Sequence, residues 1–334
     1  MNFFAVDIGS VNIKIARLVK GGSKYELEAL AMAPSPIKSI ANANDQALAN
    51  AAKVILQLKQ DSRIATKSVV TSIPESDVFV RLINLPKMTM SELETAITWE
   101  AEQYIPLPIA DVNYSYTVVG ERPDGGLDVL IVAAPIRLIE KYETLFTMAG
   151  LELVAVETEL LAAARCVAGV NSNQTILLVD IGSRSTDLAI VQMGKVVFSR
   201  SISMAGAAMT RSLMTGLQLN EDQAESFKRS FGLDQRQMEG QVAMAIGQVA
   251  QTIAVEISKT ITYYSSRTQA PINSVQLIGG SAVLPELAVY LAGLVNLEVQ
   301  IGNVWNTVDD RGRGAQIDNP SQYAVALGMA MKEV

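Results

Sequence analysis

Two aspartates stand in identical surroundings about half a chain apart. The pentapeptide Val-Asp-Ile-Gly-Ser occurs around Asp7 and again around Asp180, 173 residues later in a chain of 334. In both copies an apolar run precedes the motif, and another follows after a few small or polar residues. This pattern predicts a strand, a tight turn and a second strand. The repetition indicates two related halves, each built on one such hairpin.

The residue types of these hairpins suit the binding of a metal-bound polyphosphate. Mg²⁺ is a hard cation that takes one or two carboxylates and keeps most of its waters, so we expect Asp7 and Asp180 to hold it. Glycine turns let backbone amides approach a bound anion. The turn residues assigned to phosphate are Gly9, Ser10, Gly182 and Ser183. The alternative is a pair of ordinary turns, because Asp, Gly and Ser are common there, but the identical pentapeptide at half-chain spacing favours a phosphate clamp formed by two facing hairpins.

Other polar residues near these motifs each have two interpretations. Lys14, on the return strand, either neutralises phosphate charge or is an ordinary exposed lysine. The hydroxyl of Thr186 either meets phosphate oxygens or caps the turn. Glu225 and Lys228, at i and i+3 of a helix, either contact a ribose or pair with each other. The Gly-Gly-Ser segment at 279–281 either leaves room for a base or sugar, or is a tight turn.

The composition excludes several classes of function. A net charge of −7 argues against nucleic acid as the main partner. The chain has no histidine, which excludes Ser-His-Asp and Cys-His catalysis and histidine metal sites. One cysteine, Cys166, allows no internal disulfide and fits a reducing compartment. The absence of a long uncharged apolar run and of a basic N-terminal region predicts a cytoplasmic protein without direct membrane insertion.

The surrounding sequence predicts the elements that position these residues. The opening 75 or so residues indicate a mixed sheet carrying a helix, with a strand at 68–73 that ends at Pro74. A second strand is expected at 274–278, directly before the Gly-Gly-Ser segment. Hydrophobic content of 49% is sufficient for a substantial core, and the length predicts about two domains.

One predicted helix carries an aromatic residue that its core does not need. A capping-box match at Thr89 opens a helix that runs to about Tyr104. Its apolar residues share one face, and Trp99 points away from that face at 100° per residue. Trp99 therefore either packs against a neighbouring subdomain or belongs to a partner site.

These pieces, in this order, resemble the actin-like ATPase superfamily. VDIGSVNIK resembles its first phosphate motif, LLVDIGSRSTDLAIV its second, VQLIGGSAVLPEL its adenosine motif, and QAESFKRSFGL the helix near the ribose. The resemblance spans nearly the whole chain and implies two lobes of RNase H-like mixed sheets that bind ATP and Mg²⁺. It places Asp7 and Asp180 at the metal, and at the nucleotide Gly9, Ser10, Asn12, Lys14, Gly182, Ser183, Thr186, Gly206, Glu225, Lys228, Gly279, Gly280 and Ser281.

Two departures from the superfamily pattern bear on how tightly nucleotide binds. Asn12 stands where Ser or Thr is frequent, and Ala207 follows Gly206 where paired glycines are common. No residue is identified as a general base, so the resemblance implies an ATP-binding protein with at most weak ATPase activity.

The segment between the two halves is similar to the PilM family of type IV pilus assembly proteins. The pieces LPKM and WEAEQYIP are specific to that family. The division protein FtsA shares this insert but ends in a basic amphipathic helix, whereas this chain ends Met-Lys-Glu-Val. The resemblance implies a cytoplasmic scaffold, peripheral to the inner membrane through protein partners, that binds the N-terminal peptide of PilN between the first subdomain and the insert and communicates with pilus motor ATPases. The alternatives are an FtsA-like division or filament protein and a small-metabolite kinase of the same superfamily.

The predicted division has four parts. The first lobe core is 1–77 with connecting helices at 157–172 and 320–334, and the insert is 78–156. The second lobe core is 173–206 with 272–319, and residues 207–271 form its helical subdomain.

Overall fold

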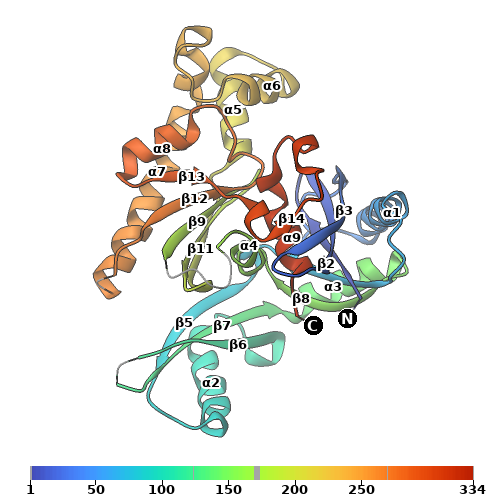
Figure 1. The fold of residues 1–334 in the computed structure, drawn as a ribbon, viewed down its shortest axis with the longest axis vertical. Coiled ribbons are helices and arrows are strands. Elements are labelled where there is room, and N and C mark those ends of the chain that lie inside the picture. The colour runs from blue at the N-terminus through green and yellow to red at the C-terminus, as the bar shows by residue number, and fades with distance from the viewer. Residues whose placement is uncertain (1, 123, 169–173, 269, 334) are drawn as a thin grey trace. The chain divides into compact units, whose positions relative to one another are not determined.

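The computed structural model describes residues 2–122, 124–168, 174–268 and 270–333, and its contacts divide the chain into two compact units. The first unit comprises Met1–Ala163, Lys195–Arg200 and Val325–Val334, and the second comprises Ala164–Gly194 and Ser201–Ala324. Figure 1 labels most of the helices and strands of both. Three elements are divided by this boundary, namely α4 (Glu159–Val167), β11 (Lys195–Ile202) and α9 (Ala324–Ala330).

The first unit contributes five neighbouring strands of a mixed sheet, in the order β3-β2-β1-β4-β8. Its elements are β1 (Phe4–Ile8), β2 (Asn12–Lys20), β3 (Tyr25–Pro34), α1 (Asp45–Asp61), β4 (Ser68–Ile73), α3 (Ile136–Met148) and β8 (Glu152–Thr158). β1, β2 and β3 form antiparallel pairs, whereas β4 is parallel to both β1 and β8. All five residues of β1 are buried, as expected for a central strand with both faces covered.

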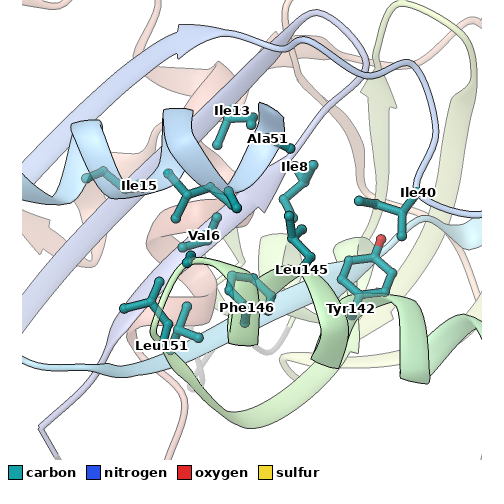
Figure 2. Close-up of a cluster of buried hydrophobic side chains, with 14 of the residues drawn as sticks. Val6, Ile8, Ile13, Ile15, Ile40, Ala51, Tyr142, Leu145, Phe146 and Leu151 are labelled. Atoms are coloured by element: carbon teal, nitrogen blue, oxygen red, sulfur yellow. The ribbon is translucent and has the colours of Figure 1, made fainter. Parts of the chain in front are cut away.

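The main core of this unit lies between one face of the sheet and the helices α1 and α3. Val6 and Ile8 of β1 pack in one buried cluster with Tyr142 and Phe146 of α3 and with Ala51 of α1 (Figure 2). Because side chains alternate along a strand, Asp7 points to the opposite face. The apolar packing thereby fixes the direction in which the first aspartate is presented.

A separate three-stranded sheet, in the order β5-β7-β6, is formed by the segment that lies between β4 and β8 in the sequence. It consists of β5 (Phe79–Leu85), β6 (Val112–Glu121) and β7 (Leu127–Pro135), together with α2 (Met90–Tyr104). Leu93 and Ile97 of α2 pack against apolar residues of β5 and β7. The capping box of α2 is present, since Thr89 and Glu92 bond each other's backbone amides.

The range predicted for the insert, 78–156, contains elements that belong to two different sheets. Its last two elements, α3 and β8, belong with the main sheet, because β8 pairs with β4 and α3 contributes to the same core as β1. The small sheet therefore spans only 79–135. The predicted domain boundaries stay predictions.

The second unit combines a sheet in the order β10-β9-β12-β13 with a group of helices. Its elements are β9 (Thr175–Ile181), β10 (Thr186–Gln192), α5 (Gly206–Leu217), α6 (Glu221–Phe231), α7 (Gln241–Thr268), β12 (Ser274–Ile278), α8 (Leu287–Val295), β13 (Val299–Ile301) and β14 (Val308–Asp309). β12 runs parallel to β9 and β13, and β9 and β10 form an antiparallel hairpin. In the ranges described above, no helix combines the length and the apolar character needed to cross a bilayer.

Candidate functional site

The first hairpin holds Asp7 and Lys14 directly opposite each other on β1 and β2. Lys14 Nζ donates to Asp7 Oδ2 at 2.9 Å, and Asp7 is only 3% exposed. The turn is closed by the amide of Gly9, which donates to the carbonyl of Asn12 at 3.0 Å. A Cβ on Gly9 would lie 2.9 Å from that carbonyl oxygen, so glycine is needed for this close turn.

A row of polar residues crosses the first sheet at the level of Asp7. Continuing the register of β1 and β4 places Ser72 beside Asp7, and Ser72 is paired in register with Glu157 of β8. Ser72 Oγ is buried and bonds no other described residue, and Glu157 accepts from Lys332 Nζ at 3.3 Å. β1, β4 and β8 are parallel and all end here, and ligands of open α/β sheets bind beyond the carboxyl ends of such strands. Ser72 could not be predicted as part of this row, because nothing in the sequence distinguishes it from an ordinary strand serine.

The second hairpin repeats this turn but differs in charge. The amide of Gly182 donates to the carbonyl of Ser185 at 3.0 Å, the same closure as between Gly9 and Asn12. The residue opposite Asp180, however, is Asp187 on β10, where the first hairpin has a lysine. The second hairpin therefore carries two carboxylates, an arrangement that attracts a cation.

The start of α5 lies against the second hairpin. The amides of Gly206 and Ala207 donate to the carbonyls of Gly182 and Ser183 at 3.1 and 2.8 Å. A Cβ on Gly206 would lie 2.5 Å from Ser281 Oγ, so only glycine allows the hairpin turn, α5 and the segment after β12 to meet.

Glu225 and Lys228 of α6 pair with each other at 2.5 Å, and Lys228 also holds α5 in place. Lys228 Nζ donates to the carbonyl of Gly206 at 3.2 Å and to Thr210 Oγ1 at 2.9 Å, which uses all three of its N–H donors. Thr210 in turn donates to Glu225 at 2.8 Å. Thr210 is a further residue of this cluster that the sequence analysis missed, because its role depends on the packing of α5 against α6.

Burial and hydrogen bonding act differently on the two charges of this pair. Burial is the largest influence on Lys228 and lowers its pKa, although Glu225 opposes the shift. For Glu225, burial alone would raise the pKa, but the hydrogen bonds from Lys228, Arg229 and Thr210 together lower it. The lysine pKa falls despite the ion pair because Lys228 as a whole is only 5% exposed.

The two glycines after β12 have different surroundings. Gly279 has φ of +93°, and a Cβ there would overlap Asp180 Oδ1. A Cβ on Gly280 would meet nothing within 4 Å. Gly279 therefore keeps the Asp180 carboxylate close to the end of β12, whereas Gly280 borders open space that a ligand could occupy.

The second unit thus brings most of its predicted site residues together. The residues that contact one another there are Asp180, Gly182, Ser183, Gly206, Glu225, Lys228, Gly279 and Ser281. Thr186 is fully buried and its hydroxyl donates to the carbonyl of Met204 at 2.7 Å, a residue outside the hairpin turn. Its assignment to phosphate stays a prediction. In the part of the chain that the structure describes, no three carboxylate or thiol groups gather into a ready-made metal site. A cation held by one or two carboxylates and water, as Mg²⁺ is, fits this donor set.

Comparison with known proteins identifies the family. The family model of the type IV pilus assembly protein PilM matches residues 5–334. The chain belongs to the PilM family. A solved PilM–PilN type IV pilus biogenesis complex is 26% identical, with a TM-score of 0.84, over 99% of this chain and 98% of that one. The predicted actin-like α/β fold is thereby confirmed, and the chain is an actin-like type IV pilus assembly protein.

More distant relatives share only parts of this PilM chain or its fold. MreB5 of Spiroplasma citri, solved with bound AMPPNP, is 15% identical over 98% of this chain and 94% of that one, with a TM-score of 0.55. The cell division protein FtsA of Bacillus subtilis (strain 168) is 31% identical over 85 residues, which are 25% of this chain and 19% of FtsA. The match thus spans about a fifth of the length of FtsA.

Proposed function

We propose that this PilM-family protein is a cytoplasmic, ATP-binding scaffold of the type IV pilus assembly complex, peripheral to the inner membrane, that binds the N-terminal peptide of PilN. The observation that supports nucleotide binding best is the convergence of Gly182, Gly206, Gly279 and Ser281 around Asp180. A close approach of backbone to backbone around a carboxylate at strand ends is what a metal-bound phosphate requires.

Each part of the site has a defined task in this proposal. Asp7 and Asp180 hold Mg²⁺ through water, and Lys14 neutralises phosphate charge as a point charge. The turn residues Gly9, Ser10, Gly182 and Ser183 present backbone amides to the phosphates. Gly280 leaves space for the nucleoside, and the ribose contact assigned to α6 falls to Glu225, because the donors of Lys228 are already used.

Nucleotide binding is tested by isothermal titration calorimetry with ATP and Mg²⁺. Gly280→Ala places a methyl group in the open space without a steric clash, so the thermal midpoint should stay unchanged while ATP affinity falls about tenfold, or ~1.4 kcal/mol. Gly293→Ala on α8 is the matched control, because its Cβ also meets nothing within 4 Å. Equal ATP affinity of both variants would show that the nucleoside does not bind beside Gly280.

Partner binding is tested by titrating the folded protein with the N-terminal cytoplasmic peptide of PilN from the same genome. Support for this partner comes from the PilM–PilN complex, which resembles the chain over nearly its whole length. Saturable binding is expected, and it should persist in Gly280→Ala if nucleotide and peptide occupy different sites. A folded protein that shows no saturable binding contradicts the scaffold function.

Two other functions within the superfamily give different results. Nucleotide turnover stimulated by small hydroxylated metabolites would indicate a metabolite kinase. ATP-dependent sedimentation, or sedimentation with lipid, would indicate an FtsA-like division or filament protein. We expect neither, and at most slow ATP hydrolysis.

A further inference from the structure

Trp99 lies on the outer face of α2 and is not covered by the rest of the unit. Its exposed fraction is 66%, whereas Leu93, Ile97 and Ala101 of the same helix are buried. Of the two roles that the sequence allows, this exposure favours the partner site. A large aromatic side chain left in solvent on a well-capped helix marks an interaction surface.

A shallow depression beside the indole is acidic. It is lined by Glu94, Thr95, Thr98, Trp99 and Glu102, which we call the acidic Trp99 face. α2 contains four glutamates and no lysine or arginine. Neither Glu94 nor Glu102 forms an ion pair with any residue that the structure describes. The face thus offers an aromatic ring between two carboxylates whose charge is not compensated nearby.

The charge of this face selects the kind of partner. Anionic membranes and nucleic acid are repelled by it, whereas a cationic side chain gains from both carboxylates and from the indole ring. Arginine fits best, because its planar guanidinium can stack on an aromatic ring while bonding a carboxylate. The same helix already shows one such contact, since the guanidinium of Arg81 lies 4.1 Å from the ring centre of Tyr104.

The spacing along α2 suggests the form of the partner segment. Glu94 and Glu102 are eight residues apart, or ~12 Å along the helix axis. In an extended chain, residues 1, 3 and 5 point to one side and span ~13 Å. Three arginines at alternate positions would therefore place their outer guanidinium groups at Glu94 and Glu102 and the middle one over Trp99.

We propose that the acidic Trp99 face docks an extended, arginine-bearing segment of a partner protein. This surface is additional to the nucleotide site and to the PilN peptide site, and the inference holds whether or not either of those functions is confirmed. Its evidence is the exposure of Trp99, the depression beside it and the uncompensated charge of Glu94 and Glu102.

The chain provides its own reporter for a test. It has two tryptophans, so Trp305→Phe leaves Trp99 as the single one. Titration of this variant with the peptide Ac-Arg-Ser-Arg-Ser-Arg-NH₂ should change Trp99 emission saturably, and 0.5 M NaCl should weaken binding because exposed charges are screened. Should Trp305→Phe fold poorly, anisotropy of the fluorescein-labelled peptide with the unmodified chain measures the same affinity.

Matched variants distinguish binding at the acidic Trp99 face from nonspecific attraction to the negative charge of the protein. Glu94→Gln with Glu102→Gln, and separately Trp99→Ala, should each weaken labelled-peptide binding about tenfold. Glu121→Gln with Glu143→Gln removes the same charge at exposed positions elsewhere in the unit and should leave binding unchanged. Ac-Lys-Ser-Lys-Ser-Lys-NH₂ should bind more weakly, because ammonium groups do not stack as guanidinium groups do.

Four results would overturn the proposal. They are unchanged Trp99 emission at saturating peptide, equal loss of affinity in the control pair, competition by the PilN N-terminal peptide, and a sedimentation change of the unmodified chain that Trp99→Ala abolishes. The last would assign the face to a second copy of this chain.

Discussion

Asp180 and Gly279 occupy neighbouring strand ends so closely that a side chain at residue 279 would overlap Asp180 Oδ1. Asp180 is the second-last residue of β9, Gly279 directly follows β12, and these two strands pair in parallel. Gly279 also has φ of +93°, a conformation that residues with a side chain rarely adopt. The glycine therefore positions the carboxylate. Both the short distance to Asp180 and the positive φ require glycine at residue 279.

Gly279→Ala should destabilise the second unit and displace Asp180. Both the overlap and the positive φ oppose alanine, so we expect a cost of about 2–4 kcal/mol and a fall of several degrees in the thermal midpoint. Differential scanning calorimetry measures it, with Gly280→Ala as the neighbouring control that meets no atom within 4 Å. A Gly279→Ala protein as stable as Gly280→Ala contradicts this account of the strand ends.

Lys228→Met should destabilise the second unit more than Arg229→Met does. Lys228 donates to the carbonyl of Gly206, to Thr210 and to Glu225, and methionine removes all three of these buried hydrogen bonds, at a cost of about 1–3 kcal/mol. Arg229 also pairs with Glu225 but is exposed, so its loss should cost less than about 1 kcal/mol.

Thermal unfolding of the two variants in parallel checks this order. Equal midpoints for Lys228→Met and Arg229→Met would show that the contacts of Lys228 with α5 contribute nothing to stability.

Some elements could be predicted from the sequence residue for residue. The strands at 68–73 and 274–278 match β4 and β12, because each is a short apolar run followed by a residue that interrupts strands, Pro74 or Gly279. The partner strand of β8 could not be predicted, for the opposite reason. Parallel pairing joins strands far apart in the sequence, and the periodicity of β8 says nothing about its partner.

The candidate site also contains some features that could be predicted from the sequence and others that could not. The two hairpins could be recognised because a repeated pentapeptide is a local signal. The triple hydrogen bonding of Lys228 could not, because a lysine in an amphipathic helix is exposed by default and only the packing of α5 on α6 buries it. Thr186 was open to two roles for a similar reason, since a hydroxyl beside a turn can point either way.

Acid should remove the contribution of Glu225 to stability. Burial would raise the pKa of this carboxyl, but the hydrogen bonds from Lys228, Arg229 and Thr210 outweigh it and hold the pKa below the usual 4.5. A lowered folded pKa stabilises the protein above the unfolded pKa, and this contribution is lost as the pH falls through the folded value. The greater stability of the unmodified chain relative to Glu225→Gln should therefore be lost below pH 4.5.

Thermal midpoints from pH 7 to pH 3 measure this advantage. The midpoint difference between the unmodified chain and Glu225→Gln should shrink in the acid range, while Glu298→Gln, at an exposed position of the same unit, should show no such trend. A difference that stays constant to pH 3 contradicts the sign of the shift.

Gly328→Ala should destabilise the first unit strongly. Gly328 lies in α9, and a Cβ there would overlap the carbonyl of Ala162 in α4, so the two helix backbones are in direct contact at this point. The clash is with backbone, which no side-chain rotation relieves, and we expect a cost of about 3 kcal/mol or more. Calorimetry with Gly293→Ala as the control measures it, and since Gly328 lies outside the nucleotide residues, ATP affinity of the fraction still folded should be unchanged. A Gly328→Ala protein with the thermal midpoint of the control would mean that α4 and α9 can separate without loss, and that their close packing does not stabilise the unit.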